Sequence, residues 1–132
     1  CWFYPNGSGQ AMLVACEGSN RFYIEVYGSF VIHWGFGNSN NSSTSEADIT
    51  IYTWWNYTAT YDGNLAKGYL NGVLKDTTTI GAQTYGTNTL KIGIYGTILD
   101  WKGKISNVQI YNKALSSTEV LQNYNTTKSR FT

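Results

Sequence analysis

The chain has 132 residues, of which 42% are hydrophobic and only 13% are charged, and its net charge is +1. Binding to phosphate groups needs clustered Lys and Arg, whereas the nine basic residues here are scattered, so the composition excludes nucleic acid as a partner. No run of about 18 apolar residues exists, which excludes membrane insertion. The length fits one domain over residues 1–132.

The composition also predicts the fold class. Aromatic residues make up 16% of the chain, with eleven Tyr and five Trp, while Pro occurs once. Tyr, Trp and Thr favour strands, and the abundant Gly and Asn favour turns, so we expect an all-β protein. A surface that is polar but poor in charge is typical of extracellular or virion-surface proteins, which is the location that we expect.

The chain enters a strand-like run, Trp2–Tyr4, directly after Cys1, which indicates the C-terminal part of a longer protein. Cys1 and Cys16 flank a turn-rich stretch, residues 5–9. In a hairpin centred on this stretch the two cysteines would face each other within disulfide reach. The alternative is two unpaired thiols. Two cysteines are too few for a disulfide scaffold or a zinc site.

Short strand-like runs then recur between turn residues, as expected for a sandwich or a barrel. Ala11–Cys16 is almost wholly apolar and should be buried on both sides. Arg21–Tyr27 alternates, so that Tyr23, Glu25 and Tyr27 share the face opposite its apolar residues. The longest loop is residues 35–47. The expected strands are Trp2–Tyr4, Ala11–Cys16, Arg21–Tyr27, Phe30–Trp34, Asp48–Tyr52, Trp54–Tyr61, Lys67–Leu70, Val73–Thr78, Thr89–Tyr95 and Lys104–Tyr111.

Tight turns and one helix complete the expected elements. Asp62-Gly63 ends a strand, and Asn71-Gly72 is a preferred two-residue hairpin turn, so the middle of the chain should form a meander. Near the C-terminus, Ser116 is a suitable N-cap, and Glu119 three residues later completes a capping box. We therefore expect a short C-terminal helix packed on the sandwich.

Four motifs in the last two thirds of the chain carry a family resemblance. They are WWNYTATYDG, GYLNGVL, LKIGIYG and WKGKISNVQIYNKALSSTEVLQNY, in this order. Their order and spacing resemble the laminin G-like branch of the concanavalin A-like lectin and glucanase superfamily. In that branch a Trp opens a strand ending in Tyr-Asp-Gly, an Asn-Gly hairpin follows, and a short helix follows Leu-Ser.

The resemblance implies a jelly-roll antiparallel β-sandwich with one short C-terminal helix. It also implies binding to carbohydrate or protein, in some members with a calcium ion at the loop rim. The strands that normally precede WFYP are absent, so the domain is expected to lack its first strand or strands. The closing residues 122–131 resemble the ends of such domains in phage and virus surface proteins.

The acidic residues and the single histidine do not form a catalytic pattern. Glycoside cleavage needs two carboxylates about 5–9.5 Å apart. Only Glu46 and Asp48 have the spacing that places two acids on one strand face, and they lie beside a Ser/Asn-rich loop without a third acid. His33 alternates with apolar neighbours as a half-exposed strand residue. We therefore expect no enzyme activity.

Calcium needs six to eight oxygen ligands, including carboxylates. Asp48 and Asp100 are the candidate metal ligands, because Asp62 already has a structural role in an Asp-Gly turn. No spacing of the EF-hand kind exists. No cofactor is otherwise expected.

Carbohydrate binding is the favoured interpretation, because aromatic rings stack on the apolar faces of sugars and amide groups bond their hydroxyls. Along Trp54–Tyr61, parity places Trp55, Tyr57, Ala59 and Tyr61 inward, and leaves Trp54 among polar residues outside. Core packing is the alternative for each Trp. The candidate carbohydrate-binding residues are Trp34, Asn38, Asn40, Trp54, Asn56 and Trp101.

The sequence thus predicts a non-catalytic recognition module at a particle or cell surface, with carbohydrate or a glycoprotein as its partner. The alternative is a structural module that assembles into a fibre, a shell or a larger complex. Its partners would then be adjacent protein segments or copies of itself, joined through open sheet edges.

Overall fold

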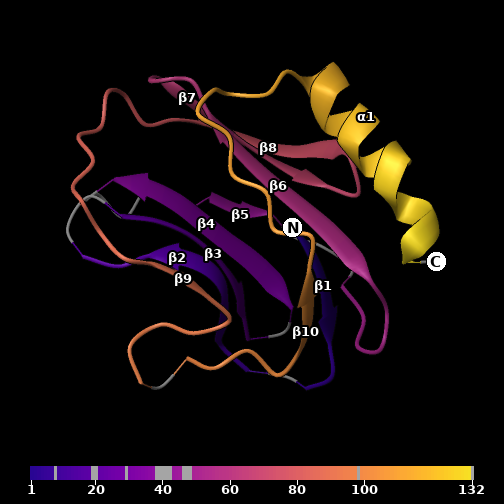
Figure 1. Ribbon diagram of the computed structural model, residues 1–132. Helices are drawn as coiled ribbons and strands as arrows, with labels where there is room; N and C mark the ends of the chain where they lie inside the picture. Colours follow the sequence, from indigo (N-terminus) through magenta and orange to yellow (C-terminus); the bar gives the residue numbers. More distant parts are fainter. Residues whose placement is uncertain are drawn as a thin grey trace.

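The computed structural model describes residues 1–7, 9–18, 21–28, 30–37, 43–45, 49–97 and 99–131. In these ranges ten strands form two five-stranded antiparallel sheets, and one helix lies against the outside of the first sheet (Figure 1). The order of the first sheet is β10-β1-β6-β7-β8, and that of the second is β5-β4-β3-β2-β9. This arrangement confirms the expected β-sandwich with a single C-terminal helix.

The bounds of the elements follow the turn residues of the sequence closely. The first sheet contains β1 (Trp2–Pro5), β6 (Trp55–Tyr61), β7 (Leu65–Leu70), β8 (Val73–Thr79) and β10 (Gly103–Ser106). The second contains β2 (Ala11–Cys16), β3 (Arg21–Tyr27), β4 (Val31–Gly37), β5 (Ser43–Ser45) and β9 (Leu90–Ile92). The helix α1 (Ser117–Thr127) continues into the 3-10 turn η1 (Lys128–Arg130). None of the described helices is long and apolar enough to cross a membrane.

The core lies between the two sheets. Its fully buried side chains include Phe3 and Tyr57 from the first sheet and Leu13, Ile32 and Trp34 from the second. Burial of each such side chain contributes about 1.5–3 kcal/mol. On β6 the odd-numbered residues belong to this core, which confirms the predicted parity of that strand.

Two of the predicted reversals have the geometry that their residues favour. Asn71 and Gly72 both have positive φ, 50° and 78°, as a two-residue hairpin turn of the primed type requires. At the other turn, Asp62 Oδ1 accepts hydrogen bonds from the backbone N–H groups of Asn64 and Leu65, at 3.0 and 2.7 Å. These bonds hold the pKa of the Asp62 carboxyl below its ordinary value.

The expected hairpin between the first two strands is wrong. β1 lies in the first sheet and β2 in the second, so the connection between them crosses from one sheet to the other. Cys1 and Cys16 accordingly lie on different sheets, and both are free thiols. The structure therefore favours the alternative of two unpaired cysteines over the predicted disulfide.

Three predicted strand boundaries also differ from the structure. The expected strand Asp48–Tyr52 is not formed by its described residues, because 49–52 lie in coil and a turn, and only Leu90–Ile92 of the expected run 89–95 forms a strand. The strand predicted to reach Tyr111 ends at Ser106, because Asn107 has a left-handed φ of 51° that breaks the extended backbone. The meander is interrupted as well, because β1, β9 and β10 join the sheets by crossovers.

Candidate functional site

The outer face of the second sheet carries a line of aromatic and polar side chains over two adjacent strands, β3 and β4. The alternate residues of both strands belong to the core, so the remaining ones point outward. A tyrosine from the loop after β9 closes one end of this line. We call these six residues the tyrosine row: Arg21, Tyr23, Glu25, Tyr27, His33 and Tyr95.

One end of the tyrosine row is built around a guanidinium group. Arg21 Nη1 donates a hydrogen bond of 2.8 Å to the Tyr95 hydroxyl. The guanidinium carbon also lies 5.2 Å from the ring centroid of Tyr23 and 5.6 Å from that of Tyr95. These contacts hold two phenol rings around one cation, since a guanidinium group is attracted to aromatic faces.

The other end of the row combines a buried carboxylate with an exposed ring. Glu25 is only 8% exposed; its Oε2 accepts a 3.1 Å hydrogen bond from Gln10 Nε2, and its Oε1 lies 3.5 Å from His33 Nδ1. The imidazole of His33 stacks on Tyr27, with ring centroids 4.9 Å apart and planes 10° apart. Tyr27 is 46% exposed, so its outer face is open to a ligand.

Gly35 shapes the middle of the row. It faces Tyr23 across the β3–β4 pair, and the Tyr23 ring lies over the space that a side chain would fill. A Cβ at this position would be 2.7 Å from Tyr23 Cε1. The absence of a side chain at Gly35 therefore allows the Tyr23 ring to pack flat against the sheet.

The tryptophans chosen from the sequence lie in three separate places. Trp34 is fully buried in the core, where no sugar can reach its ring. Trp54 is partly buried and packs on Tyr4 and Phe131, with ring centroids 5.4 and 4.9 Å away. Trp101 is partly buried, lies edge-on to the core residue Phe3 and donates through Nε1 to the Lys104 carbonyl. The structure does not bring these three rings together.

The structure does not bring the candidate asparagines together at one site either. Asn56 is 8% exposed, and its Nδ2 donates to the Cys1 carbonyl over 3.2 Å, while its backbone N–H donates to Asn71 Oδ1. Its side chain is therefore used to join strands. Asn38 and Asn40 lie outside the described residues.

The metal candidates are not assembled into a site by the described residues. Asp48 lies outside them, as does Glu46, the other acid of the i, i+2 spacing. Asp100 is exposed and lines a small cavity of about 180 Å³ with Gln10 and Trp101. Within the ranges that the structure covers, no three His, Cys, Asp or Glu side chains gather. These residues alone do not fit the six to eight oxygen ligands of calcium.

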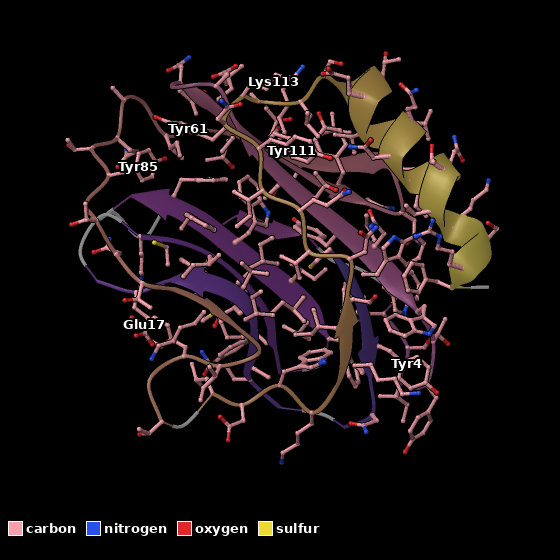
Figure 2. The ribbon with its side chains drawn as sticks, in the orientation of Figure 1. Tyr4, Glu17, Tyr61, Tyr85, Tyr111 and Lys113 are labelled. Atoms are coloured by element: carbon pink, nitrogen blue, oxygen red, sulfur yellow. The ribbon has the colours of Figure 1, made fainter. Side chains whose placement is uncertain are left out.

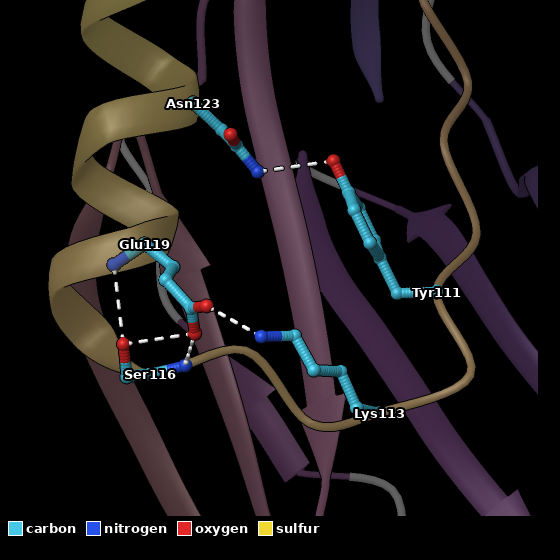
Figure 3. A network of polar contacts seen from close by, with 5 residues as sticks. All are labelled: Tyr111, Lys113, Ser116, Glu119 and Asn123. Atoms are coloured by element: carbon cyan, nitrogen blue, oxygen red, sulfur yellow. Dashed lines mark hydrogen bonds and ion pairs between the residues drawn. The ribbon is translucent and has the colours of Figure 1, made fainter.

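Several acidic residues outside the tyrosine row have clear structural partners. Glu17 forms an ion pair with Lys91 at 2.8 Å and accepts from the Gly96 N–H, and these contacts hold the pKa of its carboxyl below the ordinary value. Glu119 accepts from the backbone and the hydroxyl of Ser116 and pairs with Lys113 (Figure 3). These partners, with Lys113 the largest contributor, lower the pKa of Glu119 to about 2.

A second feature is a cavity of about 520 Å³ beside β6. It is bounded by Thr58–Tyr61 of β6 on one side and by residues 107–115 on the other. The residues that line it include Tyr61, Tyr85, Tyr111 and Lys113, and Figure 2 labels all four in the upper half of the view. Burial and the neighbouring Tyr61 raise the pKa of Tyr85 to about 12.

Comparison with known proteins gives a family and a set of similar folds. The family model described as Laminin_G_3, concanavalin A-like lectin/glucanases superfamily, matches residues 1–121. No curated protein sequence gives a significant match.

Three solved structures illustrate the similarity. The sialidase CBM40 of Ruminococcus gnavus, bound to α2,3-sialyllactose, is 17% identical with a TM-score of 0.74, over 93% of this chain and 79% of that one. A putative carbohydrate-binding protein from Bacteroides ovatus is 15% identical, with a TM-score of 0.76, over 92% and 38%. Domain 4 of an extracellular GH43 arabinanase from Geobacillus stearothermophilus, in complex with arabinotriose, is 20% identical, with a TM-score of 0.71, over 92% and 62%. The chain therefore spans less than two thirds of the length of two of these structures, and at these identities the likeness shows the fold.

Proposed function

Because the chain belongs to the Laminin_G_3 family of the concanavalin A-like lectin/glucanases superfamily, we propose that it is a non-catalytic carbohydrate-binding module. The observation that carries the proposal is the tyrosine row, an outward-facing surface of flat rings interleaved with hydrogen-bonding groups. The descriptions of the similar structures support the ligand class, since they name sialyllactose, arabinotriose and carbohydrate binding.

The row has the chemistry that sugar recognition requires. The exposed face of the Tyr27 ring can stack on the C–H face of a pyranose ring, and the opposite face of Tyr27 stacks on His33. Glu25 is 8% exposed and its two carboxylate oxygens contact Gln10 and His33, so its role is to fix the His33 ring against Tyr27. Arg21 keeps further N–H donors for an acidic sugar.

A panel of oligosaccharides tests this proposal. Sialyllactose and arabinotriose are the first two probes, followed by a glycan array, each titrated against the purified chain by calorimetry. We expect Tyr27→Ala to weaken binding of whichever sugar is recognised by about two- to tenfold, since one aromatic contact contributes about 0.5–1.5 kcal/mol.

Tyr52→Ala is the matched control, because Tyr52 is 62% exposed and contacts Tyr4 at the far sheet. Equal loss of affinity in both variants, or no binding of any sugar at millimolar concentration, would contradict the proposal. Repeating the titrations with calcium and with a chelator tests whether Asp48 and Asp100 hold an ion, which stays a prediction. We also propose that the module is located outside the cell or on the surface of a virion.

The structural role remains the second candidate, and one observation favours it. Along Thr58–Tyr61, β6 has no strand partner on the β1 side among the described residues. An open strand edge of this kind recruits another strand.

A further inference from the structure

The two ends of the tyrosine row differ in charge. At one end, the Glu25 carboxylate is 8% exposed, and its oxygens contact Gln10 and His33. At the other end lies the guanidinium group of Arg21, a half-buried side chain four residues earlier on the same strand. Since a strand rises about 3.4 Å per residue, the two positions lie roughly 14 Å apart along β3. The row therefore has a cationic end that is well separated from its acidic end.

The cation at this end lacks an acidic partner. Arg21 forms no ion pair with any of the described carboxylates. Glu17 contacts the loop that carries Tyr95, but both of its oxygens are already used. Its Oε2 pairs with Lys91 at 2.8 Å, and its Oε1 accepts from the Gly96 N–H at 2.7 Å. The charge of the guanidinium group is therefore left for a ligand.

A second cation lies beside Tyr23 on the same face of the sheet. Lys91 of β9 is paired with Ala15 of β2, and Ala15 is paired with Tyr23 of β3. Residues directly opposite each other in antiparallel strands share one face, so Lys91 projects from the outer face next to the row. Arg21 and Lys91 against the single carboxylate of Glu17 leave this end with a net positive charge, which favours an anionic ligand.

The polar groups that Arg21 and Tyr95 present are hydrogen-bond donors. A guanidinium group carries several N–H donors and no acceptor, and Nη1 of Arg21 donates to the Tyr95 hydroxyl at 2.8 Å. Because the Tyr95 oxygen accepts this bond, its own hydrogen is available as a further donor. The rings of Tyr23 and Tyr95 lie 5.2 and 5.6 Å from the guanidinium carbon and restrain its orientation. Such oriented donors favour a ligand group that offers several oxygen lone pairs.

From these observations we propose that the Arg21 end of the tyrosine row is the subsite for the carboxylate of an acidic sugar, a uronic or a sialic acid. The carboxylate accepts two N–H bonds from Arg21, in the parallel geometry that guanidinium and carboxylate groups share, and the O–H bond of Tyr95. The other sugars of the ligand lie toward Tyr27. This inference rests on the proposed carbohydrate-binding function and adds to it the charge of the ligand and its direction on the row.

Glu25 determines where along the row an acidic sugar fits. A carboxylate placed near His33 would meet the like charge of Glu25. A carboxylate at Arg21 is roughly 14 Å from that position, which exceeds the screening length of about 8 Å at physiological ionic strength. An oligosaccharide with one terminal acidic sugar therefore fits the row better than a polymer that carries a carboxylate on every ring.

Two pairs of sugars test this subsite, and in each pair one member lacks the carboxylate. Glucuronate differs from glucose in this group alone, and sialyllactose differs from lactose by its sialic acid. Each sugar is titrated into the isotope-labelled chain, and NMR follows the side-chain Nε–H of Arg21 and the amides of Tyr27 and His33. We expect the acidic member of at least one pair to bind about tenfold more tightly and to shift Arg21 Nε most, because hydrogen bonds between charged groups are the stronger class. The pair that responds identifies the acid.

Substitutions of the cation separate charge from geometry. Arg21→Gln should abolish the preference for the acidic sugar, and Arg21→Lys should keep only part of it, because an ammonium group cannot form the two parallel bonds. Lys104→Gln is the matched control and should leave the preference unchanged. Lys104 also lies over a tyrosine ring, 5.0 Å from the centroid of Tyr4, but it belongs to the first sheet.

Equal affinities within both pairs, or an unchanged preference in Arg21→Gln, would overturn the proposal. Acetate that binds Arg21 as tightly as glucuronate would do the same, since the group would then bind simple anions without recognising a sugar. Shifts at Tyr27 and His33 without any at Arg21 would contradict this proposal alone and leave the carbohydrate-binding function intact. That function fails separately, when no oligosaccharide of the panel shifts Tyr27 or His33.

Discussion

Gly35 illustrates how a residue without a side chain can define a binding surface. The Tyr23 ring occupies the place of its missing Cβ, and an added methyl carbon would lie 2.7 Å from Cε1 and 3.1 Å from Cζ. Gly35→Ala should therefore displace the Tyr23 ring away from the sheet, so that the surface of the tyrosine row is no longer flat. We expect sugar affinity to fall by roughly tenfold, with a change in stability below about 1 kcal/mol because Tyr23 is partly exposed and can move.

The control for this change is Gly7→Ala. A Cβ at Gly7 meets only ordinary contacts, the nearest at 3.6 Å from Lys102, and lies outside the row. Calorimetric titration and thermal unfolding of both variants check the prediction. An unchanged affinity in Gly35→Ala would mean that the flat position of the Tyr23 ring has no part in binding.

The pKa of Glu119 gives a second prediction at the residue scale. Its folded pKa of about 2 lies below the ordinary value of 4.5, so the ionised form stabilises the folded chain. This stabilisation is complete above about pH 4.5 and is lost as the pH falls through about 2. Urea unfolding of the parent chain and of Glu119→Gln should therefore differ at pH 6 and converge toward pH 2.

Asp100→Asn is a suitable comparison, because Asp100 is an exposed acid outside the helix cap. A difference between Glu119→Gln and the parent chain that does not depend on pH would contradict the electrostatic explanation and leave only the lost cap.

Residue types alone do not identify the tyrosine row. Trp34 is a candidate by residue type, yet it shares its strand face with Ile32 and is fully buried. The alternation of Arg21–Tyr27 did place Tyr23, Glu25 and Tyr27 on one face. That pattern could have identified the row, but the stack of Tyr27 on His33 joins two strands and is visible only once β3 and β4 are paired.

At the scale of elements, the β7–β8 hairpin links its turn to the helix. Gly72 has a φ of 78°, and a Cβ there would lie 3.1 Å from both Leu121 Cδ1 and Tyr124 Cβ of α1. Gly72→Ala should therefore strain the turn and displace the helix together. We expect a loss of about 1–3 kcal/mol in unfolding free energy, with a further loss from the displaced helix contacts.

Gly63→Ala separates the two effects. Gly63 has a φ of 99°, but nothing lies within 4 Å of the Cβ position, so this variant carries backbone strain alone. Chemical unfolding should show Gly72→Ala to be the less stable of the two. Equal losses of unfolding free energy in the two variants would mean that α1 moves away from residue 72 without an energetic cost.

Local signals predicted most elements, and non-local contacts decided the remainder. The alternation of Arg21–Tyr27, the Asn71-Gly72 turn and the Ser116 cap each act over a few residues, and each is present in the structure. The placement of β1 in a different sheet from β2 depends on the pairing of β1 with β6 and β10, which lie about fifty and a hundred residues further along the chain. A pattern of a few residues contains no information about such distant partners. The early end of β10 at Asn107 depends on one backbone conformation that an asparagine tolerates.

At the scale of the whole molecule, the tyrosine row and the cavity beside β6 lie on different sheets. The row lies on the outer face of β3 and β4, and the cavity lies at the edge of β6. Tyr23 of the row also lines that cavity, so the two regions meet at this residue.

The central claim is that the tyrosine row is the carbohydrate-binding surface, and NMR titration of the labelled chain with a bound oligosaccharide tests it most directly. We expect the largest chemical-shift changes at Tyr23, Tyr27 and His33, with Ala59 and Tyr61 unaffected. Changes concentrated around Ala59, Tyr61 and Tyr111, with none on β3 and β4, would contradict it.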